Sequence, residues 1–360
     1  MRLSLERLLA CVVLTAVFAL TADSAQSAVL TVTNTQDSGA GSLRDTISAA
    51  SAGDTIQFDA ALNGQTITLT TGELRIVDKD VTINGPGADK LTVQRATAEG
   101  IPAFRIFNIA ISSSHAPTVG LSGLTLANGR APADGVAPQA GGAIYFDGLE
   151  LTIDNCVISG NSAGSGGAVY VSYHGGFSPT LVLTNSVISG NSAISGGGLY
   201  ITFITGSISA RPGRLTMTNS TVSGNVATHL GGGLYNLGGA SITRSTISGN
   251  DATMDAAGGG GGIYNANGLS VSNSTISGNS ASLGGGIKNV RADFFFLPGF
   301  STITSCTISD NSATQGGGIY SFGPGIQQTR NSIIARNSSA NGPDMKGDLT
   351  SQGFNLIGNN

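Results

Sequence analysis

A sixteen-residue phrase at residues 273–288, NSTISGNSASLGGGIK, returns along the chain with small changes. The Asn of its SGN element recurs every 25–34 residues, at Asn161, Asn191, Asn225, Asn250, Asn279, Asn311 and Asn337. A recurrence of this length is typical of a solenoid, in which each repeat buries its apolar face only by stacking on the next.

Within each copy, apolar and polar residues alternate with period two, as in LTIDN and LVLTN. Short β-branched runs of this kind indicate strands, not helices. A further short strand follows two or three glycines, residues that tolerate positive φ. We therefore predict an all-β chain, a right-handed single-stranded parallel β-helix (solenoid) with two or three strands in each coil and a short N-terminal capping helix. Long helical runs are absent and 54 of 360 residues are glycine, which excludes helical repeats.

Equal positions of successive coils should stack about 4.8 Å apart and form columns. An aliphatic column inside stands three residues before the Asn: Ile158, Ile188, Val222, Ile247, Ile276, Ile308 and Ile334. The recurring Asn residues should form a structural Asn column at a left-handed turn, because each amide both donates and accepts along the axis.

On this interpretation the chain divides into four segments. Residues 1–27 resemble a signal peptide, with a charged start, an apolar run too short to span a bilayer and small residues before a cut after Ser27. Residues 28–118 are an N-terminal cap and the first coils. Residues 119–340 are the repeat array. Residues 341–360 are a last partial coil, and we expect a truncated product or one whose end is closed by something else.

The cap contains a predicted helix at residues 42–50. Ser42 and Asp45 form a capping box, and Leu43, Ile47 and Ala50 share one face that should cover the N-terminal end of the solenoid. Insertions of variable length enter at residues 175–179, 202–214, 251–258 and 291–299, where binding loops are expected. The last of them holds three consecutive Phe residues, which either fold onto the wall or meet a partner.

Two cysteines, Cys156 and Cys306, stand in one column five coils apart, which puts them roughly 24 Å from each other. A disulfide needs Cα atoms within about 7 Å. We expect two separate buried thiols, no metal site and no cofactor.

The segment VTNTQDSGAGSLRDTISAASAGDTIQF resembles the N-terminal motif of CSLREA-domain proteins, which are bacterial surface or secreted β-helix proteins; Gly41 stands where that family has Cys. The GGG-I-Y and SGN repeats are similar to those of polymorphic outer-membrane proteins. Residues 347–360 resemble the last coil of CSLREA-type β-helices, just before a surface-anchoring region. The resemblance implies a β-helix at the cell surface or outside the cell.

The best surface feature is a column of tyrosines that follow the glycines: Tyr145, Tyr170, Tyr200, Tyr235, Tyr264 and Tyr320, broken by Lys288. These phenols either present a platform for glycan or stack on one another and shield the sheet. Trp is absent, which weakens a saccharide-enzyme interpretation.

No catalytic residue can be assigned from columns of charged side chains. Asp154 faces Thr184 and Ser122, and Asp310, Arg244 and Arg330 stand alone in the same way. The histidines His115, His174 and His229 lie in unrelated contexts. A composite site built across insertions stays open.

We therefore expect a secreted or cell-surface protein of the bacterial outer membrane or exterior, a monomer with a structural or adhesin-like role and no catalysis. Its partner would be an extracellular glycan, surface polymer or neighbouring cell surface. With a net charge of −4 and no basic stripe, nucleic acid is not expected. Membrane association would come only through a missing anchor or outer-membrane export. The alternative is a polysaccharide lyase or glycoside hydrolase of the pectin-lyase-like β-helix superfamily.

Overall fold

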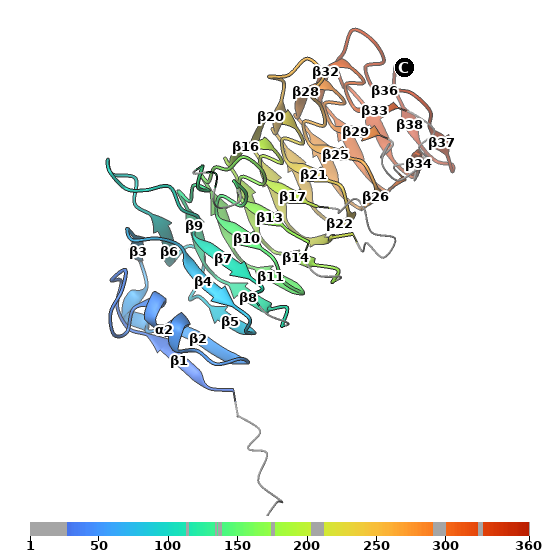
Figure 1. Ribbon diagram of the computed structural model, residues 1–360. Coiled ribbons are helices and arrows are strands. Elements are labelled where there is room, and N and C mark those ends of the chain that lie inside the picture. Colours follow the sequence, from blue (N-terminus) through green and yellow to red (C-terminus); the bar gives the residue numbers. More distant parts are fainter. Residues whose placement is uncertain are drawn as a thin grey trace, which may run out of the picture.

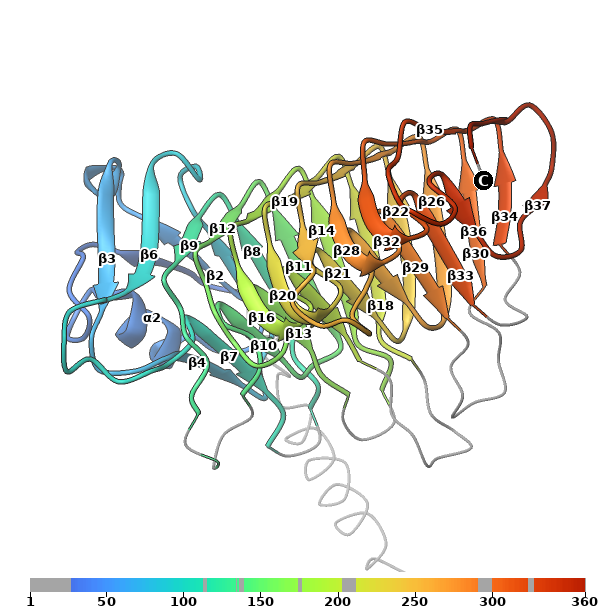
Figure 2. The same ribbon diagram turned by 90° about the horizontal axis from the view of Figure 1, so that it is seen from above.

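The computed structural model describes residues 27–359 except 113–114, 134, 136–138, 174–176, 203–211, 291–299 and 323–326. Nearly all of the expected signal peptide, the triple-Phe insertion, His174 and most of the insertion at 202–214 lie outside the described residues. In the described part, strands of successive coils stack side by side from the blue end to the red end of the chain (Figures 1 and 2).

Within the described residues, strands pair in parallel with those of adjacent coils, which confirms the predicted parallel β-helix. Sheet A contains β1 (Val29–Val32), β2 (Asp54–Phe58), β5 (Val81–Asn84), β8 (Thr118–Ser122), β11 (Glu150–Asp154), β14 (Thr180–Thr184), β18 (Arg214–Thr218), β22 (Gly239–Thr243), β26 (Gly268–Ser272), β30 (Ser301–Thr304), β34 (Gln327–Arg330) and β37 (Thr350–Ser351). Sheet B contains β3 (Gln65–Leu69), β6 (Leu91–Arg95), β9 (Thr125–Ala127), β12 (Val157–Ser159), β15 (Val187–Ser189), β19 (Thr221–Ser223), β23 (Thr246–Ser248), β27 (Thr275–Ser277), β31 (Thr307–Ser309), β35 (Ile333–Ala335) and β38 (Leu356–Ile357).

Sheet C follows the glycines and contains β4 (Leu74–Val77), β7 (Phe107–Ala110), β10 (Ile144–Phe146), β13 (Val169–Val171), β17 (Leu199–Ile201), β21 (Leu234–Asn236), β25 (Ile263–Asn265), β29 (Ile287–Val290), β33 (Ile319–Phe322) and β36 (Met345–Lys346). A fourth sheet, sheet D, was not expected: β16 (Ser192–Ser195), β20 (Val226–Leu230), β24 (Asp251–Ala252), β28 (Ser280–Leu283) and β32 (Ser312–Gln315). It forms because the residues just after the column Asn also pair between coils, and it buries a small cluster of Ala227, Ala252 and Ala281.

The inner aliphatic column is in register as predicted. Ile188, Val222 and Ile247 occupy consecutive rungs of sheet B, and each is at most 1% exposed. Burial of such side chains contributes about 1.5–3 kcal/mol each and is the main favourable term for folding. Cys156 and Cys306 are both buried free thiols, and burial raises the pKa of Cys156 to about 11.

The glycines before sheet C have two separate roles. The glycine three residues before the aliphatic residue of sheet C, such as Gly231 before Leu234, has positive φ, as expected. The next one is required by close packing between coils: a Cβ on Gly232 would lie 2.4 Å from the carbonyl oxygen of Gly261. Real Cβ contacts are longer than this, so only glycine fits the stack without a shift of backbone. In other coils the position after this glycine also holds alanine, as at Ala143 and Ala168.

At the N-terminal end, helix α2 (Leu43–Ala49) packs against β1 and β4, and a 3₁₀ turn follows at η1 (Ala60–Leu62) (Figure 1). Ser42 caps α2 by accepting from the backbone N–H of Asp45, and Leu43 and Ile47 enter the core. Arg44 connects the helix to the first coils, donating to Asp37 and to the carbonyls of Gly72 and Glu73. The predicted capping helix is confirmed.

The interior is not apolar throughout. On sheet C the inward position after the Tyr holds Phe146, Val171 and Ile201, and then changes to Asn236, Asn265 and Asn289. Nδ2 of Asn236 donates to Oδ1 of Asn265 over 2.8 Å, and Nδ2 of Asn265 donates to Oδ1 of Asn289 over 2.7 Å. In these coils the amides satisfy each other along the axis, just as aliphatic side chains stack in the earlier ones.

Candidate functional site

The Tyr column lies on the outer face of sheet C, where parallel register places the rings above one another. Ring centroids are 5.7 Å apart for Tyr145–Tyr170, 4.9 Å for Tyr170–Tyr200, 4.6 Å for Tyr200–Tyr235 and 4.8 Å for Tyr235–Tyr264, with interplanar angles of 8–33°. Each ring is half-buried. Because the faces of the rings contact each other, the groups that solvent meets are ring edges and hydroxyls.

Cations lie at both ends of this five-ring stack. Lys288 takes the rung after Tyr264 and separates it from Tyr320, and its Nζ lies 5.6 Å from the centre of the Tyr264 ring. At the other end the Arg105 guanidinium lies 5.2 Å from the centre of the Tyr145 ring. The sequence showed Lys288 only as a break in the column, and gave no sign of Arg105, which comes from the segment before β7.

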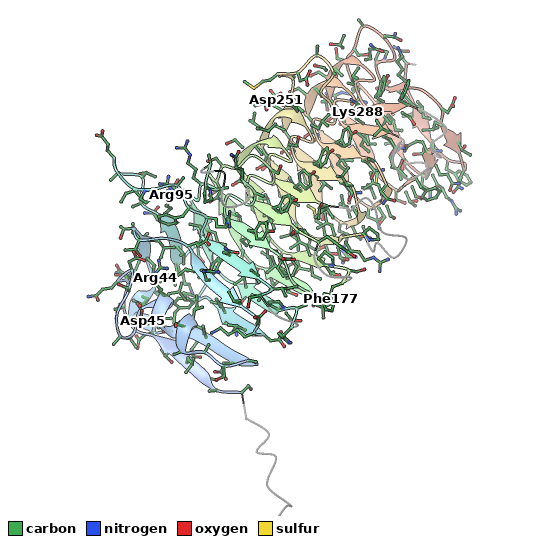
Figure 3. All side chains as sticks on the ribbon, viewed as in Figure 1. Arg44, Asp45, Arg95, Phe177, Asp251 and Lys288 are labelled. Carbon is green, nitrogen blue, oxygen red and sulfur yellow. The ribbon has the colours of Figure 1, made fainter. Side chains whose placement is uncertain are left out.

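Burial shifts the pKa of several side chains on this face. It raises the pKa of Tyr145, Tyr170, Tyr200 and Tyr235, so these phenols stay neutral well above pH 7. Burial also lowers the pKa of Lys288, which is 8% exposed and donates to the carbonyl of Ala257 over 2.9 Å. Figure 3 places Lys288 among the strands of sheet C. The column thus offers neutral hydroxyls, with its lysine already engaged by the protein.

The Asn column forms as predicted, at the corner after sheet B. In each coil the backbone N–H and Nδ2 of one Asn donate to Oδ1 of the next, as for Asn225 to Asn250 at 3.0 Å each, and Nδ2 also donates to a carbonyl of the preceding coil. The left-handed residue is not the Asn itself but its predecessor, for example Gly224 with φ of 61°. These side chains are buried, so the column has a structural role and offers no binding surface.

Several acids have a partner of opposite charge or a histidine close by. Asp310 forms an ion pair with Arg336 of the next coil at 2.8 Å, so its predicted isolation was wrong; both residues precede a column Asn, and this shared offset was a signal that could have revealed the pair. His115 contacts Asp80 at 3.0 Å. His229 approaches Asp255 at 3.7 Å.

Asp154 faces Thr184 and Ser122, as predicted from the register. Its Oδ1 accepts from Thr184 Oγ1 over 2.6 Å and from Asn185 Nδ2 over 2.8 Å. It also borders a groove of about 590 Å³ at the outer corner between sheets A and B. The repeat pattern of the sequence does not indicate this groove.

Among residues placed by the structure, no group of three His, Cys, Asp or Glu side chains is arranged to hold a metal ion. No helix in the described ranges is both long and apolar enough to cross a membrane.

Comparison with known proteins agrees with this architecture. The family model of the Chlamydia polymorphic membrane protein repeat matches residues 155–172 and 305–321. Each match runs from the left-handed turn after sheet A to the Tyr strand of sheet C. The chain is thus similar to polymorphic membrane proteins in its β-helix repeats, and this repeat points to a bacterial surface or outer-membrane protein.

Among solved structures, the A-module of the mannuronan C-5 epimerase AlgE6 of Azotobacter vinelandii is similar, with 13% sequence identity and a TM-score of 0.44. The alignment covers 91% of this chain and 98% of that module. No curated protein matches the sequence.

Proposed function

We propose that this chain is a secreted or cell-surface β-solenoid with a structural, adhesin-like role, which binds glycan or surface polymer along one face. The observation that carries the proposal is the shared register of its outward side chains: hydroxyls of Thr, Ser and Tyr recur on sheets A, B and C in successive coils, with Lys288 as a break on sheet C. Equal contacts repeated at about 4.8 Å suit weak multivalent binding to a repetitive polymer.

The N-terminal segment is proposed to be a CSLREA-type cap, and residues 1–27 a signal peptide for export. The cap geometry supports the first of these proposals, because Ser42, Leu43 and Arg44 of the SLRD motif each have a defined contact. Mass spectrometry of the mature N-terminus, together with antibody labelling of intact cells, tests the second. An uncut N-terminus or labelling only after lysis would contradict surface exposure.

The adhesive role is tested with a glycan array probed by the purified mature chain, followed by binding of the same chain to intact cells. We expect retention on a subset of glycans, weak for the monomer and much stronger when the chain is multimerised on beads, because avidity multiplies weak contacts. Silence on both the array and the cells would leave only the scaffold role.

The polysaccharide lyase or hydrolase alternative requires several charged side chains converging in a groove, since acid–base cleavage needs paired carboxylates or their equivalent. In the described part of the array, Asp154 and Asp310 each bond to side chains of the next coil. Release of reducing ends or unsaturated products from a panel of glycans would revive this alternative.

A further inference from the structure

The outer corner between sheets A and B carries a second, exposed row of polar side chains. Its backbone is left-handed in every coil of the array, as at Asn155, Asn185 and Asn219 with φ of 51°, 49° and 50°. Hydrogen bonds run along this row: Arg244 Nε donates to Asn219 Oδ1 at 3.0 Å, and Asn219 Nδ2 donates to Asn185 Oδ1 at 3.4 Å. Asn185 Nδ2 then donates to Asp154 Oδ1 at 2.8 Å, so the row ends on a carboxylate.

In the coil that precedes Asn155, the row has a glycine and therefore no side chain. The pairing of Asp154 with Ser122 puts Gly123 on the next rung, with φ of 59°. The loop of residues 85–89 closes down on this glycine, and a Cβ there would lie 2.6 Å from the Gly85 carbonyl oxygen. This loop, Gly123 and the next coil at Asn155 line a groove of about 590 Å³, a size within the range of about 300–1,000 Å³ usual for ligand sites.

The lining of the groove combines acceptors, donors and small apolar surfaces. Asp89 and Asp154 supply carboxylates, Asn155 and Asn185 supply amides, and Val157 and Val187 supply apolar surface. No Lys or Arg is among its described lining residues. Two carboxylates without a lining cation disfavour an anionic ligand, whereas carboxylates and amides together match a ligand that carries both O–H donors and oxygen acceptors.

Asp154 is held in place before any ligand arrives, since two donors fix its Oδ1. Such preorganisation lowers the entropy cost of binding. The ring faces of the Tyr column are used by neighbouring rings, which leaves edges and hydroxyls for a ligand. Of the two surfaces, the corner groove is therefore the one into which a sugar ring can dock.

We propose that this groove is a binding subsite for a neutral, hydroxyl-rich saccharide. The proposal rests on the glycan-binding role proposed above and names its location and ligand class. Asp154, Asn155 and Asn185 bond the hydroxyls, and the two valines contact the C–H surface of the ring.

The test uses a matched pair of variants of the full chain. Val187→Trp fills the groove, whereas Thr246→Trp places the same side chain at the equivalent outward position two coils away, outside it. Both positions point outward and are half-buried, so both variants should fold, which circular dichroism and thermal melting check. A third variant, Asp154→Thr, introduces the residue that the same column carries at Thr184 and Thr218.

Binding is measured by calorimetry with neutral oligosaccharides selected on the array and with uronate oligosaccharides. We expect neutral ligands only, at least about a tenfold loss of affinity for Val187→Trp and for Asp154→Thr, and wild-type affinity for Thr246→Trp.

Equal affinity of the two Trp variants for the glycan would show that the groove is not the binding site, while leaving glycan adhesion intact. Preference for uronates, or binding of calcium alone that Asp154→Thr abolishes, would overturn the ligand class. Failure of the wild-type chain to bind any glycan or any intact cell would overturn both this proposal and the adhesive role, and only this outcome affects both.

Discussion

Asn337 ends its column of stacked amides on a carboxylate, since its backbone N–H and its Nδ2 both donate to Oδ1 of Asp344, each over 2.9 Å. Every earlier rung is an Asn, which accepts from one neighbour and donates to the other. An ionised Asp only accepts. Asp344 can accept the last pair of hydrogen bonds of the column. An Asp within the column would lack the Nδ2 donor that each Asn supplies there.

Asp in the middle of the column should therefore be far more harmful than Asn at its end. Asn225→Asp loses the Nδ2 donor and puts a buried charge against the Asn250 and Ile188 oxygens, at a cost of about 3–5 kcal/mol of unfolding free energy. Asn225→Ala leaves the Asn191 donors unpartnered and costs about 1–3 kcal/mol. Asp344→Asn keeps the acceptor for Asn337 and should cost about 1 kcal/mol.

Urea unfolding followed by circular dichroism measures all three variants. We expect Asn225→Asp to be the most destabilised of the three and Asp344→Asn the least. An Asn225→Asp variant as stable as Asp344→Asn would show that donor direction along the column does not matter.

The glycine stack predicts a contrast between two neighbouring glycines. Gly232→Ala brings a Cβ to 2.4 Å from the Gly261 oxygen and 2.6 Å from the Asp251 oxygen, so the coils must separate at a cost of about 1–3 kcal/mol. Gly239→Ala meets nothing within 4 Å and has no positive φ; it should be neutral or stabilising by up to about 1 kcal/mol. Thermal melting of both variants checks this, and equal losses would argue against coil-to-coil packing as the reason for the glycines.

The columns could be predicted because a coil repeats its own residue order, and stacking places like positions together. The same distance in sequence from the column Asn, three residues, separates Ile188, Val222 and Ile247 from it. This constant distance places them on consecutive rungs of sheet B. Asn236 and Asn265 were missed because an Asn after a short strand is typical of a turn, and only the three-dimensional path shows that it points inward.

The groove was out of reach of the repeat pattern for a different reason. It depends on a side chain that is missing at Gly123 and on the loop at residues 85–89, which belongs to an irregular early coil. An alignment of repeats identifies residues that recur from coil to coil, whereas this groove forms where an early coil departs from the repeat.

The break in the Tyr column makes Lys288→Tyr a stabilising substitution. Burial penalises the ammonium, and a phenol at this rung would instead stack on Tyr264 and Tyr320. Each aromatic pair contributes about 0.5–1.5 kcal/mol, so we expect a gain of about 1 kcal/mol after loss of the hydrogen bond to Ala257. Lys288→Met, which removes the charge without a ring, is the control for stacking. A less stable Lys288→Tyr would mean that the lysine is held by its bond to the 251–258 insertion.

The N-terminal cap should loosen in acid through Asp37. Burial alone would raise the pKa of Asp37, but hydrogen bonds from Arg44, Thr70 and Thr71 outweigh it and hold the pKa well below its usual range. A carboxyl with a lowered folded-state pKa stabilises fully above its unfolded value of about 4, and this contribution is lost as the pH falls from there toward the folded value.

Asp37→Asn should therefore destabilise the cap at pH 7, by about 1 kcal/mol for this half-buried group, and its difference from wild type should shrink as the pH falls below about 4. Limited proteolysis near helix α2 between pH 3 and 7 reports the opening of the cap. Thr71→Val removes one donor but keeps the carboxylate, so it should lower protection while retaining the acid dependence. A constant gap between wild type and Asp37→Asn across this range would mean that the carboxylate of Asp37 does not govern the acid response of the cap.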